Sequence, residues 1–204
     1  MMRWIYWLGW TLFGSAYRTL FGLKVIGREN LVREGPVLVV ANHESFLDPP
    51  LIGTLYQDEM YYLARKSLMT TDLLKWIYLA WNSIPVDQDR PDMTGLKAII
   101  KLLSSGKRVV IFPEGERSLD GVIAQAQPGV GLIAVKANVV IQPIRIEGAR
   151  EALPRGSGRV RFSQISLHIG KPIRLTEKEL TGAKGKHGYQ AIADRLLDAV
   201  KGLA

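Results

Sequence analysis

Short apolar runs rich in valine and isoleucine alternate along the chain with segments whose apolar residues recur at helical spacing. The runs predict strands at residues 23–27, 36–41, 60–64, 83–87, 108–113 and 139–146, and a longer alternating stretch lies at 159–169. Helical spacing predicts helices at about 72–81, 93–105, 130–137 and 189–200. This alternation predicts an α/β fold with a mixed, largely parallel sheet flanked by helices.

Two local signals refine this picture. Asp48 followed by Pro49 predicts a further helix, with Asp48 as its N-cap and Pro49 at the first helical position. The glycine- and lysine-rich segment 184–188 predicts a flexible loop before the last helix.

The first 22 residues form a distinct segment. Residues 4–17 carry no charge, Arg3 and Arg18 bracket them, and three of the five tryptophans lie in the first ten residues. A helix of this length reaches roughly 21 Å, which is short of the ~30 Å hydrocarbon core of a bilayer. Tryptophan and tyrosine also favour the headgroup level. We therefore predict a membrane-seated helical element at residues 1–22, which holds one domain at 23–204 on the cytoplasmic side of the cell membrane as a monotopic or peripheral protein.

Three other interpretations of this segment stay open. A tilted helix over residues 3–23 could span the membrane if Arg18 extends to the interface. Gly14-Ser15-Ala16 resembles the cleavage site of a signal peptide. A helix buried in a soluble core is the third interpretation.

Composition narrows the class of protein. The 204 residues, 47% of them apolar, suit one ordinary domain with a full core. The formal net charge of +8 favours anionic partners without choosing among nucleic acid, lipid and acidic protein. The chain has no cysteine, which excludes disulfides, thiol catalysis and cysteine-ligated metals.

The first candidate site is the segment Asn-His-Glu-Ser-Phe-Leu-Asp at residues 42–48, which directly follows a predicted strand. Sites in α/β proteins gather at the carboxyl ends of strands. Five residues across a turn let Asp48 fold back onto His43, where a carboxylate would fix the imidazole tautomer for general-base work. The alternative is that Asp48 only caps its helix and His43 packs.

The second candidate site is Phe-Pro-Glu-Gly-Glu-Arg-Ser at residues 112–118, which directly follows the predicted strand at 108–113. Gly115 permits close backbone approach to a ligand, and the Arg117 guanidinium is suited to a phosphate. Glu114 could orient Arg117 or a substrate hydroxyl. Glu116 beside Arg117 could equally form a plain surface ion pair.

Together, these two motifs about 70 residues apart resemble those of the glycerolipid acyltransferase superfamily, in particular the 1-acylglycerol-3-phosphate (lysophosphatidic acid) acyltransferases. The resemblance extends from about residue 23 to 172. It implies that His43 is the catalytic base with Asp48 as its partner, and that residues of the second motif bind the acceptor, namely Glu114, Gly115, Arg117 and Ser118. It also implies the same mixed sheet and N-terminal membrane element, and neither a metal nor a bound cofactor.

The chain departs from the family pattern at several positions. Gln88 stands where the family usually has arginine after Ile-Pro-Val-Asp, and Arg90 is the candidate replacement. Glu116 replaces a common threonine, and the fourth motif, at 139–143, keeps only its second proline. Lys66, next to Arg65, could meet the phosphates of the acyl donor, although a solvated basic turn fits as well.

The function implied is direct acyl transfer, without an acyl-enzyme, from acyl-CoA or acyl carrier protein to a lysophospholipid hydroxyl. The expected acceptor is 1-acylglycerol-3-phosphate, which would give phosphatidic acid. The alternatives are another lysolipid acceptor or a non-catalytic lipid-binding protein at the membrane surface. Nucleic-acid binding rests on net charge alone and lacks a recognition motif, so we expect no nucleic-acid partner.

Overall fold

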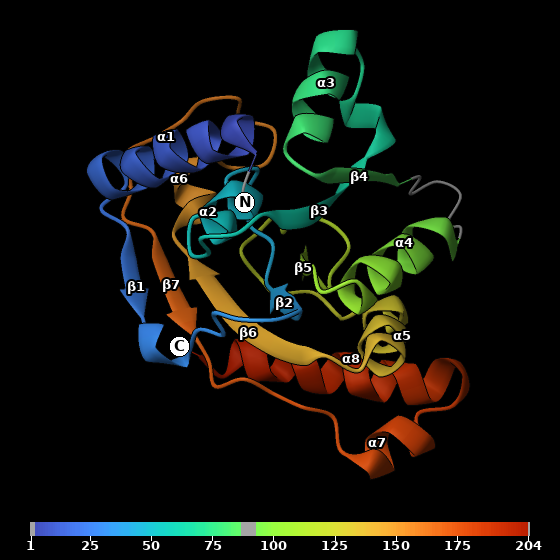
Figure 1. Ribbon diagram of the computed structural model, residues 1–204. Coiled ribbons are helices and arrows are strands. Elements are labelled where there is room, and N and C mark those ends of the chain that lie inside the picture. Colours follow the sequence, from blue (N-terminus) through green and yellow to red (C-terminus); the bar gives the residue numbers. More distant parts are fainter. Residues whose placement is uncertain (1–2, 87–92, 204) are drawn as a thin grey trace.

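The computed structural model describes residues 3–86 and 93–203, and its centre is one seven-stranded sheet with the order β1-β7-β6-β2-β5-β3-β4 (Figure 1). The strands are β1 (Lys24–Ile26), β2 (Val37–Ala41), β3 (Met60–Arg65), β4 (Ser83–Val86), β5 (Arg108–Ile111), β6 (Val140–Glu147) and β7 (Ser166–Ile169). All neighbours are parallel except β6 and β7, so β1 and β7 run against the other five strands. The predicted mixed, largely parallel sheet is confirmed.

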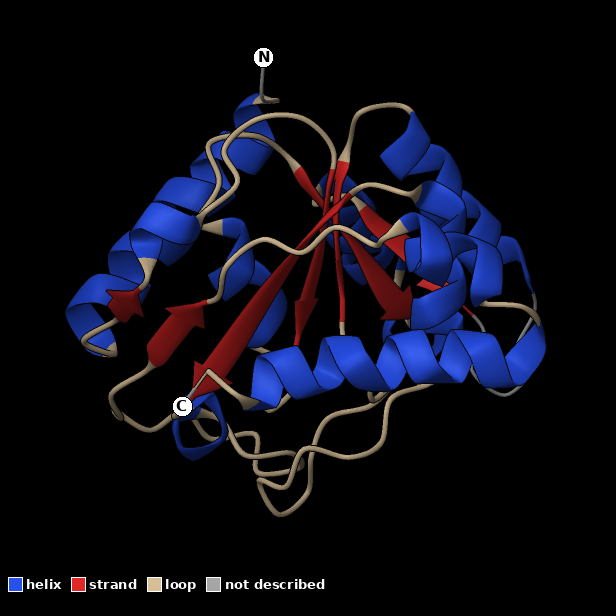
Figure 2. Cartoon of the chain, turned by 90° about the horizontal axis from the view of Figure 1, so that it is seen from below, coloured by secondary structure: helices blue, strands red, loops and turns tan. Residues whose placement is uncertain are grey.

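Helices cover both faces of this sheet (Figure 2). They are α1 (Trp4–Leu20), α2 (Asp48–Gly53), α3 (Asp72–Ala80), α4 (Met93–Ser104), α5 (Pro128–Ala137), α6 (Ala149–Ala152), α7 (Glu177–Gly182) and α8 (Gly185–Lys201). Alternate β2 side chains enter different cores: Val37 and Val39 pack with α1, α2 and α6, whereas Leu38 and Val40 pack with α4, α5 and α8. The period of two places the central strand between two hydrophobic layers.

Helix α1 lies against the domain along one face and is exposed along the other. Tyr6 and Tyr17 are buried, the Tyr6 hydroxyl accepts from the amide of Met60 at 2.9 Å, and the Tyr17 hydroxyl donates to the carbonyl of Leu47 at 2.8 Å. The exposed face carries large apolar side chains, namely Trp4, Trp7, Leu8, Leu12 and Leu20. Within residues 3–86 and 93–203, no helix combines the length and apolar character needed to cross a membrane.

Three local predictions were wrong. The segment 184–188 is not a loop, because α8 begins at Gly185 and the earlier part of the segment contributes its N-cap. Only Ser166–Ile169 of the alternating stretch 159–169 pairs as a strand, and residues 159–162 are exposed chain. Asp48 is the first residue of α2 and does not cap it, since Leu47 holds the N-cap position without a side-chain bond.

Two helices were missed. Helix α7 begins with a capping box between Thr176 and Glu179, a pattern visible in the sequence as Thr-x-x-Glu. Helix α6 is only four residues long, too short for a periodic signal. The end of the predicted strand 83–87 lies outside the described residues.

Candidate active site

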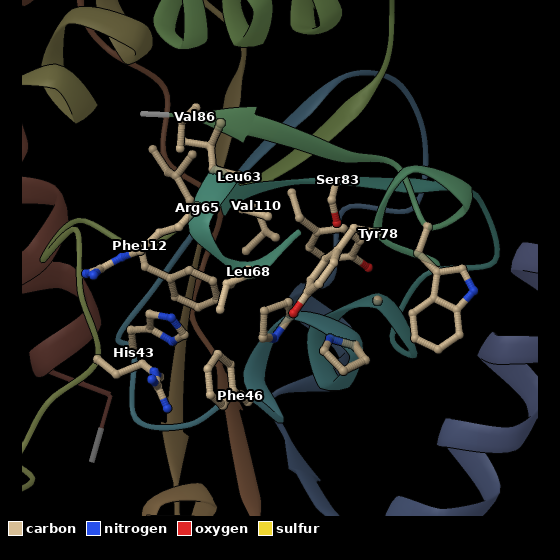
Figure 3. A pocket seen from close by; sticks show the side chains of 18 of the residues that line it. His43, Phe46, Leu63, Arg65, Leu68, Tyr78, Ser83, Val86, Val110 and Phe112 are labelled. Atoms are coloured by element: carbon tan, nitrogen blue, oxygen red, sulfur yellow. The ribbon is translucent and has the colours of Figure 1, made fainter. Parts of the chain in front are cut away.

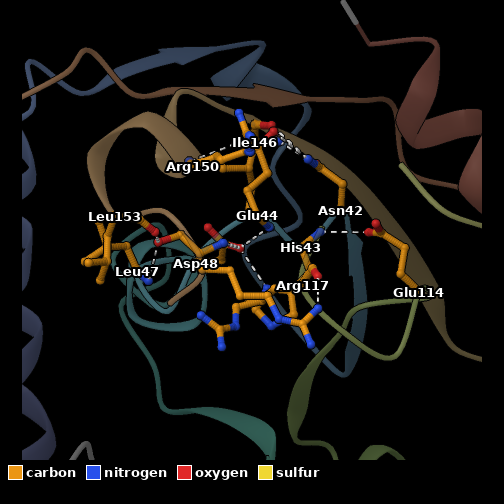
Figure 4. Close-up of polar contacts among 12 residues, drawn as sticks. Asn42, His43, Glu44, Leu47, Asp48, Glu114, Arg117, Ile146, Arg150 and Leu153 are labelled. Atoms are coloured by element: carbon orange, nitrogen blue, oxygen red, sulfur yellow. Dashed lines mark hydrogen bonds and ion pairs between the residues drawn. The ribbon is translucent and has the colours of Figure 1, made fainter. Parts of the chain in front are cut away.

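His43 and Asp48 meet at the carboxyl end of β2. The imidazole Nδ1 lies 2.7 Å from Oδ2 of Asp48, whose side chain is fully buried, whereas the His43 ring is partly exposed (Figure 4). A carboxylate only accepts hydrogen bonds, so this contact places the ring proton on Nδ1 and leaves the Nε2 lone pair free for a proton. The ring also stacks on Phe112, with centroids 4.0 Å apart.

The Asp48 carboxylate is held by the chain that precedes it. Its Oδ2 accepts the amide N–H groups of Glu44 at 2.6 Å and Ser45 at 2.7 Å as well as the imidazole contact, and Oδ1 has no partner within the described residues. These bonds point backward over the 43–48 turn and not forward into α2. Their direction fixes the carboxylate against His43 and leaves no capping role.

The second motif supports the first through its backbone contacts. The amide N–H of His43 donates to Oε1 of Glu114 at 2.8 Å, the amide of Ala124 donates to Oε2 at 3.3 Å, and the Ser118 amide donates to the His43 carbonyl at 2.8 Å. Glu114 is only 5% exposed, and this burial raises the pKa of its carboxyl to about 7. Glu114 therefore lies against the backbone that carries the imidazole.

A cavity of about 610 Å³ opens beside His43 (Figure 3). Its walls are mainly apolar side chains from α1, α2, α3, β3 and β5, including Phe13, Pro50, Leu63, Tyr78, Trp81 and Val110. At Gly9 a Cβ atom would lie 2.8 Å from the Trp81 ring, so glycine is required where α1 meets this wall. A cavity of this size and lining suits a long apolar ligand that reaches a few polar groups at one end.

Three arginines lie at the polar end of the cavity. Arg65, Arg117 and Arg155 all line the cavity. Glu116 forms ion pairs with Arg65 and with Arg155. Burial, and then the charges of Arg155 and Arg65, lower the pKa of Arg117, and one of its guanidinium nitrogens is buried without a partner among the described residues. Such a surplus of partly desolvated positive charge is an anion-binding environment.

The other predicted site residues have different positions. Gly115 lines the cavity with a φ of +78°, a backbone conformation that favours glycine. Ser118 uses its hydroxyl in the following turn, where it accepts from the amide of Gly121. Lys66 lies in the exposed 3-10 turn η2 (Lys66–Leu68) and does not line the cavity, although Arg65 does. Arg90 and Gln88 lie outside the described residues.

Sequence reasoning missed three contributors. Arg155 comes from the loop after α6, donates to the Arg117 carbonyl at 2.8 Å, and carried no sequence signal. Phe46 lies under Arg117, with the guanidinium carbon 3.5 Å from the ring centroid, and its place inside the first motif was the available signal. The buried Asn42 exchanges two hydrogen bonds with the backbone of Ile146, which ties the start of the motif to β6.

No group of three or more potential metal ligands occurs among residues 3–86 and 93–203. The arrangement as a whole offers an oriented base, an apolar cavity and a cationic end. It is suited to proton abstraction from a hydroxyl that belongs to an anionic amphiphile.

Comparison with known proteins identifies the family. A family model described as Acyltransferase matches residues 22–147, and the chain belongs to this family. A 1-acyl-sn-glycerol-3-phosphate acyltransferase of Chlamydomonas reinhardtii is 31% identical over 159 residues, which are 75% of this chain and 47% of that protein. The chloroplastic 1-acyl-sn-glycerol-3-phosphate acyltransferase LPAT1 of Arabidopsis thaliana is 29% identical over 78% of this chain and 46% of its own length.

The chain thus spans about half the length of these plant and algal relatives, which are 46% and 47% covered. A 1-acyl-sn-glycerol-3-phosphate acyltransferase of Bacillus subtilis is 25% identical over 89% of this chain and 88% of that protein. The crystal structure of the 1-acyl-sn-glycerophosphate acyltransferase PlsC from Thermotoga maritima superposes with a TM-score of 0.77 at 24% identity, covering 97% of this chain and 78% of that one. This last similarity shows that the fold is shared.

Proposed function

We propose that this protein transfers a fatty acyl chain from acyl-CoA or acyl carrier protein to the free hydroxyl of 1-acylglycerol-3-phosphate, forming phosphatidic acid. The observation that carries the proposal is the His43–Asp48 pair at the junction of an apolar cavity and a cluster of arginines. The names of its relatives, which are 1-acyl-sn-glycerol-3-phosphate acyltransferases, support the same reaction.

In the proposed step, Nε2 of His43 takes the proton of the acceptor hydroxyl as its oxygen attacks the thioester carbonyl carbon. The carbon–sulfur bond then breaks, and the departing thiolate recovers the proton from the imidazolium. Asp48 stabilises the imidazolium through the 2.7 Å contact to Nδ1. The step needs no acyl-enzyme, and Ser45, the hydroxyl of the 42–48 segment, is a poor nucleophile candidate because it is buried and donates to the Leu153 carbonyl at 2.9 Å.

The arginine cluster gives the acceptor phosphate a place in this proposal. The Arg117 guanidinium packs on the Phe46 ring, and Arg155 bonds the backbone carbonyl of Arg117, so both the side chain and the backbone of Arg117 are held. The entropic cost of ordering the Arg117 side chain when an anion binds is therefore small. The cavity would hold an acyl chain while the phosphate remains at its arginine-lined end.

We also propose that α1 seats the protein in the cytoplasmic leaflet of the cell membrane without crossing it. Its exposed face is apolar and rich in tryptophan, whereas its opposite face packs on the domain. Helix α3 adds a second exposed apolar surface, with Leu73, Trp76 and Leu79. Both helices line the cavity, so a lipid would pass between membrane and site without entering water.

The test is an assay of purified protein with 1-acylglycerol-3-phosphate and each donor in turn, with the matching monoacylglycerol as the phosphate-free control acceptor. Phosphatidic acid should form with at least one donor, and the monoacylglycerol should be a poor acceptor. Equal use of both acceptors would contradict the assigned acceptor. Absence of product with either donor, from folded protein that binds 1-acylglycerol-3-phosphate, would favour a lipid-binding protein.

A further inference from the structure

The loop that joins α6 to β7 carries apolar and basic side chains into solvent. Residues 156–162, Gly-Ser-Gly-Arg-Val-Arg-Phe, are all exposed. Phe162 is 80% exposed and Val160 is 58% exposed, although neither belongs to a core. Exposed apolar side chains that gather on one surface segment, unlike ones scattered singly, mark a candidate interaction site.

The charge around this loop has one sign. No acidic residue occurs between Glu151 and Glu177, whereas Arg155, Arg159 and Arg161 fall within the loop region. Arg155 pairs with Glu116, but Arg159 and Arg161 form no ion pair within the described parts of the chain. The exposed segment is therefore a basic surface with apolar side chains between the charges.

The topology places this loop at the same edge of the sheet as the active site. Strand β6 is parallel to β2, whose carboxyl end leads to His43, and the loop follows the carboxyl end of β6 through α6. The loop then meets the end of α1, where the Ile165 amide donates to the Phe21 carbonyl at 3.0 Å. Figure 1 shows the loop passing beside α1, on the side of the molecule away from α7 and α8.

We propose that residues 156–162 form a second membrane-docking element, in which Arg159 and Arg161 bind the phosphates of anionic lipids while Val160 and Phe162 enter the interface. Arginine side chains can reach headgroup phosphates while neighbouring apolar groups lie deeper. The loop would add charge-dependent binding to the apolar contact proposed for α1, and it would fix the rotation of the domain above the bilayer. This inference extends the proposed seating of α1 and does not depend on the acyl-transfer reaction.

An acidic protein, such as an acyl carrier protein, is the competing partner for a basic loop. Two observations favour the bilayer. Phe162 and Val160 are two large exposed apolar side chains that charge alone does not explain, and the segment that follows the loop is bonded to the end of α1, whose exposed face is also apolar. A small acidic protein has no need of so extended an apolar surface.

The test is vesicle flotation of the full chain with phosphatidylcholine vesicles, with and without phosphatidylglycerol. Arg159→Gln together with Arg161→Gln should weaken binding to the anionic vesicles by about five-fold per arginine, roughly 30-fold in total, and leave binding to neutral vesicles unchanged. Phe162→Ser should weaken binding to both kinds of vesicle. Acyl transfer in detergent micelles should stay at the wild-type level in both the double-arginine variant and Phe162→Ser, which separates this inference from the proposed reaction.

The matched control is Lys171→Gln together with Arg174→Gln, which removes the same charge. These exposed residues follow β7 at the opposite edge of the sheet, beside the bridge between Ile141 and Ile173. The control should bind anionic vesicles like wild type. Equal weakening of control and loop variants would overturn the proposal, because net charge alone would then explain binding. Undiminished vesicle binding with reduced affinity for acyl carrier protein would overturn it in favour of the protein partner.

Discussion

Replacing Asp48 with asparagine separates the charge of this side chain from its shape. The carboxylate Oδ2 accepts three N–H groups, and Oδ1 has no partner among the described residues. An asparagine can place its carbonyl oxygen at the Oδ2 position and its amide at the Oδ1 position, so the three N–H groups on Oδ2 each keep an acceptor. The reverse orientation would direct N–H groups at N–H groups and is excluded.

Asp48→Asn should lower activity because it removes the charge that stabilises the His43 imidazolium. A full carboxylate charge roughly 4 Å from a protonated ring contributes about 4 kcal/mol at an effective dielectric constant near 20. Losing it should reduce turnover by about 10²–10³-fold. Three charge-assisted bonds become neutral bonds, which should lower the free energy of unfolding by about 1–3 kcal/mol. Because Asp48 does not cap α2, the helix itself should be unaffected.

Initial rates with 1-acylglycerol-3-phosphate and urea unfolding would measure both effects. Asp120→Asn is the matched control, since its exposed carboxylate accepts the Val122 amide at 2.9 Å in a neighbouring turn and does not contact His43. That control should keep wild-type turnover. A folded Asp48→Asn protein with wild-type turnover would refute the argument that the carboxylate charge stabilises the imidazolium.

Three further changes test the remaining parts of the site. His43→Ala should lower turnover by about 10²–10⁴-fold in steady-state assays while leaving the melting temperature close to wild type, and a fully active variant would remove the proposed base. Arg117→Ala should reduce kcat/KM for 1-acylglycerol-3-phosphate by about 10–150-fold and affect a monoacylglycerol much less, whereas Arg117→Lys should recover only part of the loss; equal effects on both acceptors would show that Arg117 is structural. Burial raises the pKa of Glu114 from 4.5 to about 7, so the folded protein retains this proton after the unfolded chain has lost it, and stability falls as pH rises through that interval by up to about 3 kcal/mol. Glu114→Gln should therefore flatten the pH dependence of urea unfolding between about pH 5 and 8, the exposed Glu116→Gln should not, and an unchanged slope in Glu114→Gln would contradict the assigned cause.

Several features of the fold could be predicted because they depend on local pattern. The runs at 36–41 and 109–113 are apolar at every position, which is typical of strands buried on both faces, and both belong to central strands of the sheet. The polar residues after each run were therefore expected at strand ends. His43 and Glu114 do lie there, on neighbouring strands.

Other features depend on tertiary contacts that leave no local pattern. Residues 184–188 contain glycine and lysine and favour a loop, yet the chain from Gly185 continues into α8, whose buried face packs against α5. Residues 159–162 alternate like a strand, but they belong to no strand of the described sheet and stay exposed. Arg155 reaches the site from a loop 38 residues beyond Arg117, and nothing in its neighbours indicates this position.

Asp48 shows that one sequence pattern can be compatible with two different roles of a residue. An aspartate before Pro49 favours the N-cap of a helix, and an aspartate five residues after a histidine favours a catalytic pair, so the sequence supports both roles. The structure distinguishes them by direction, because the carboxylate accepts from Glu44 and Ser45, which precede it. Only the conformation of the 43–48 turn determines this direction.

The register of two central strands determines how the motifs meet. Val40 of β2 lies opposite Ile111 of β5, so both strands end at the same height, and the residues after them come into contact although they are 71 apart in sequence. A slip of two residues would preserve the buried faces but move Glu114 by about 6.6 Å relative to His43. The 2.8 Å bond between the His43 amide and Glu114 cannot accommodate such a shift. The position of the imidazole thus depends on strand register as well as on Asp48, and this register could not be derived from the spacing of the motifs.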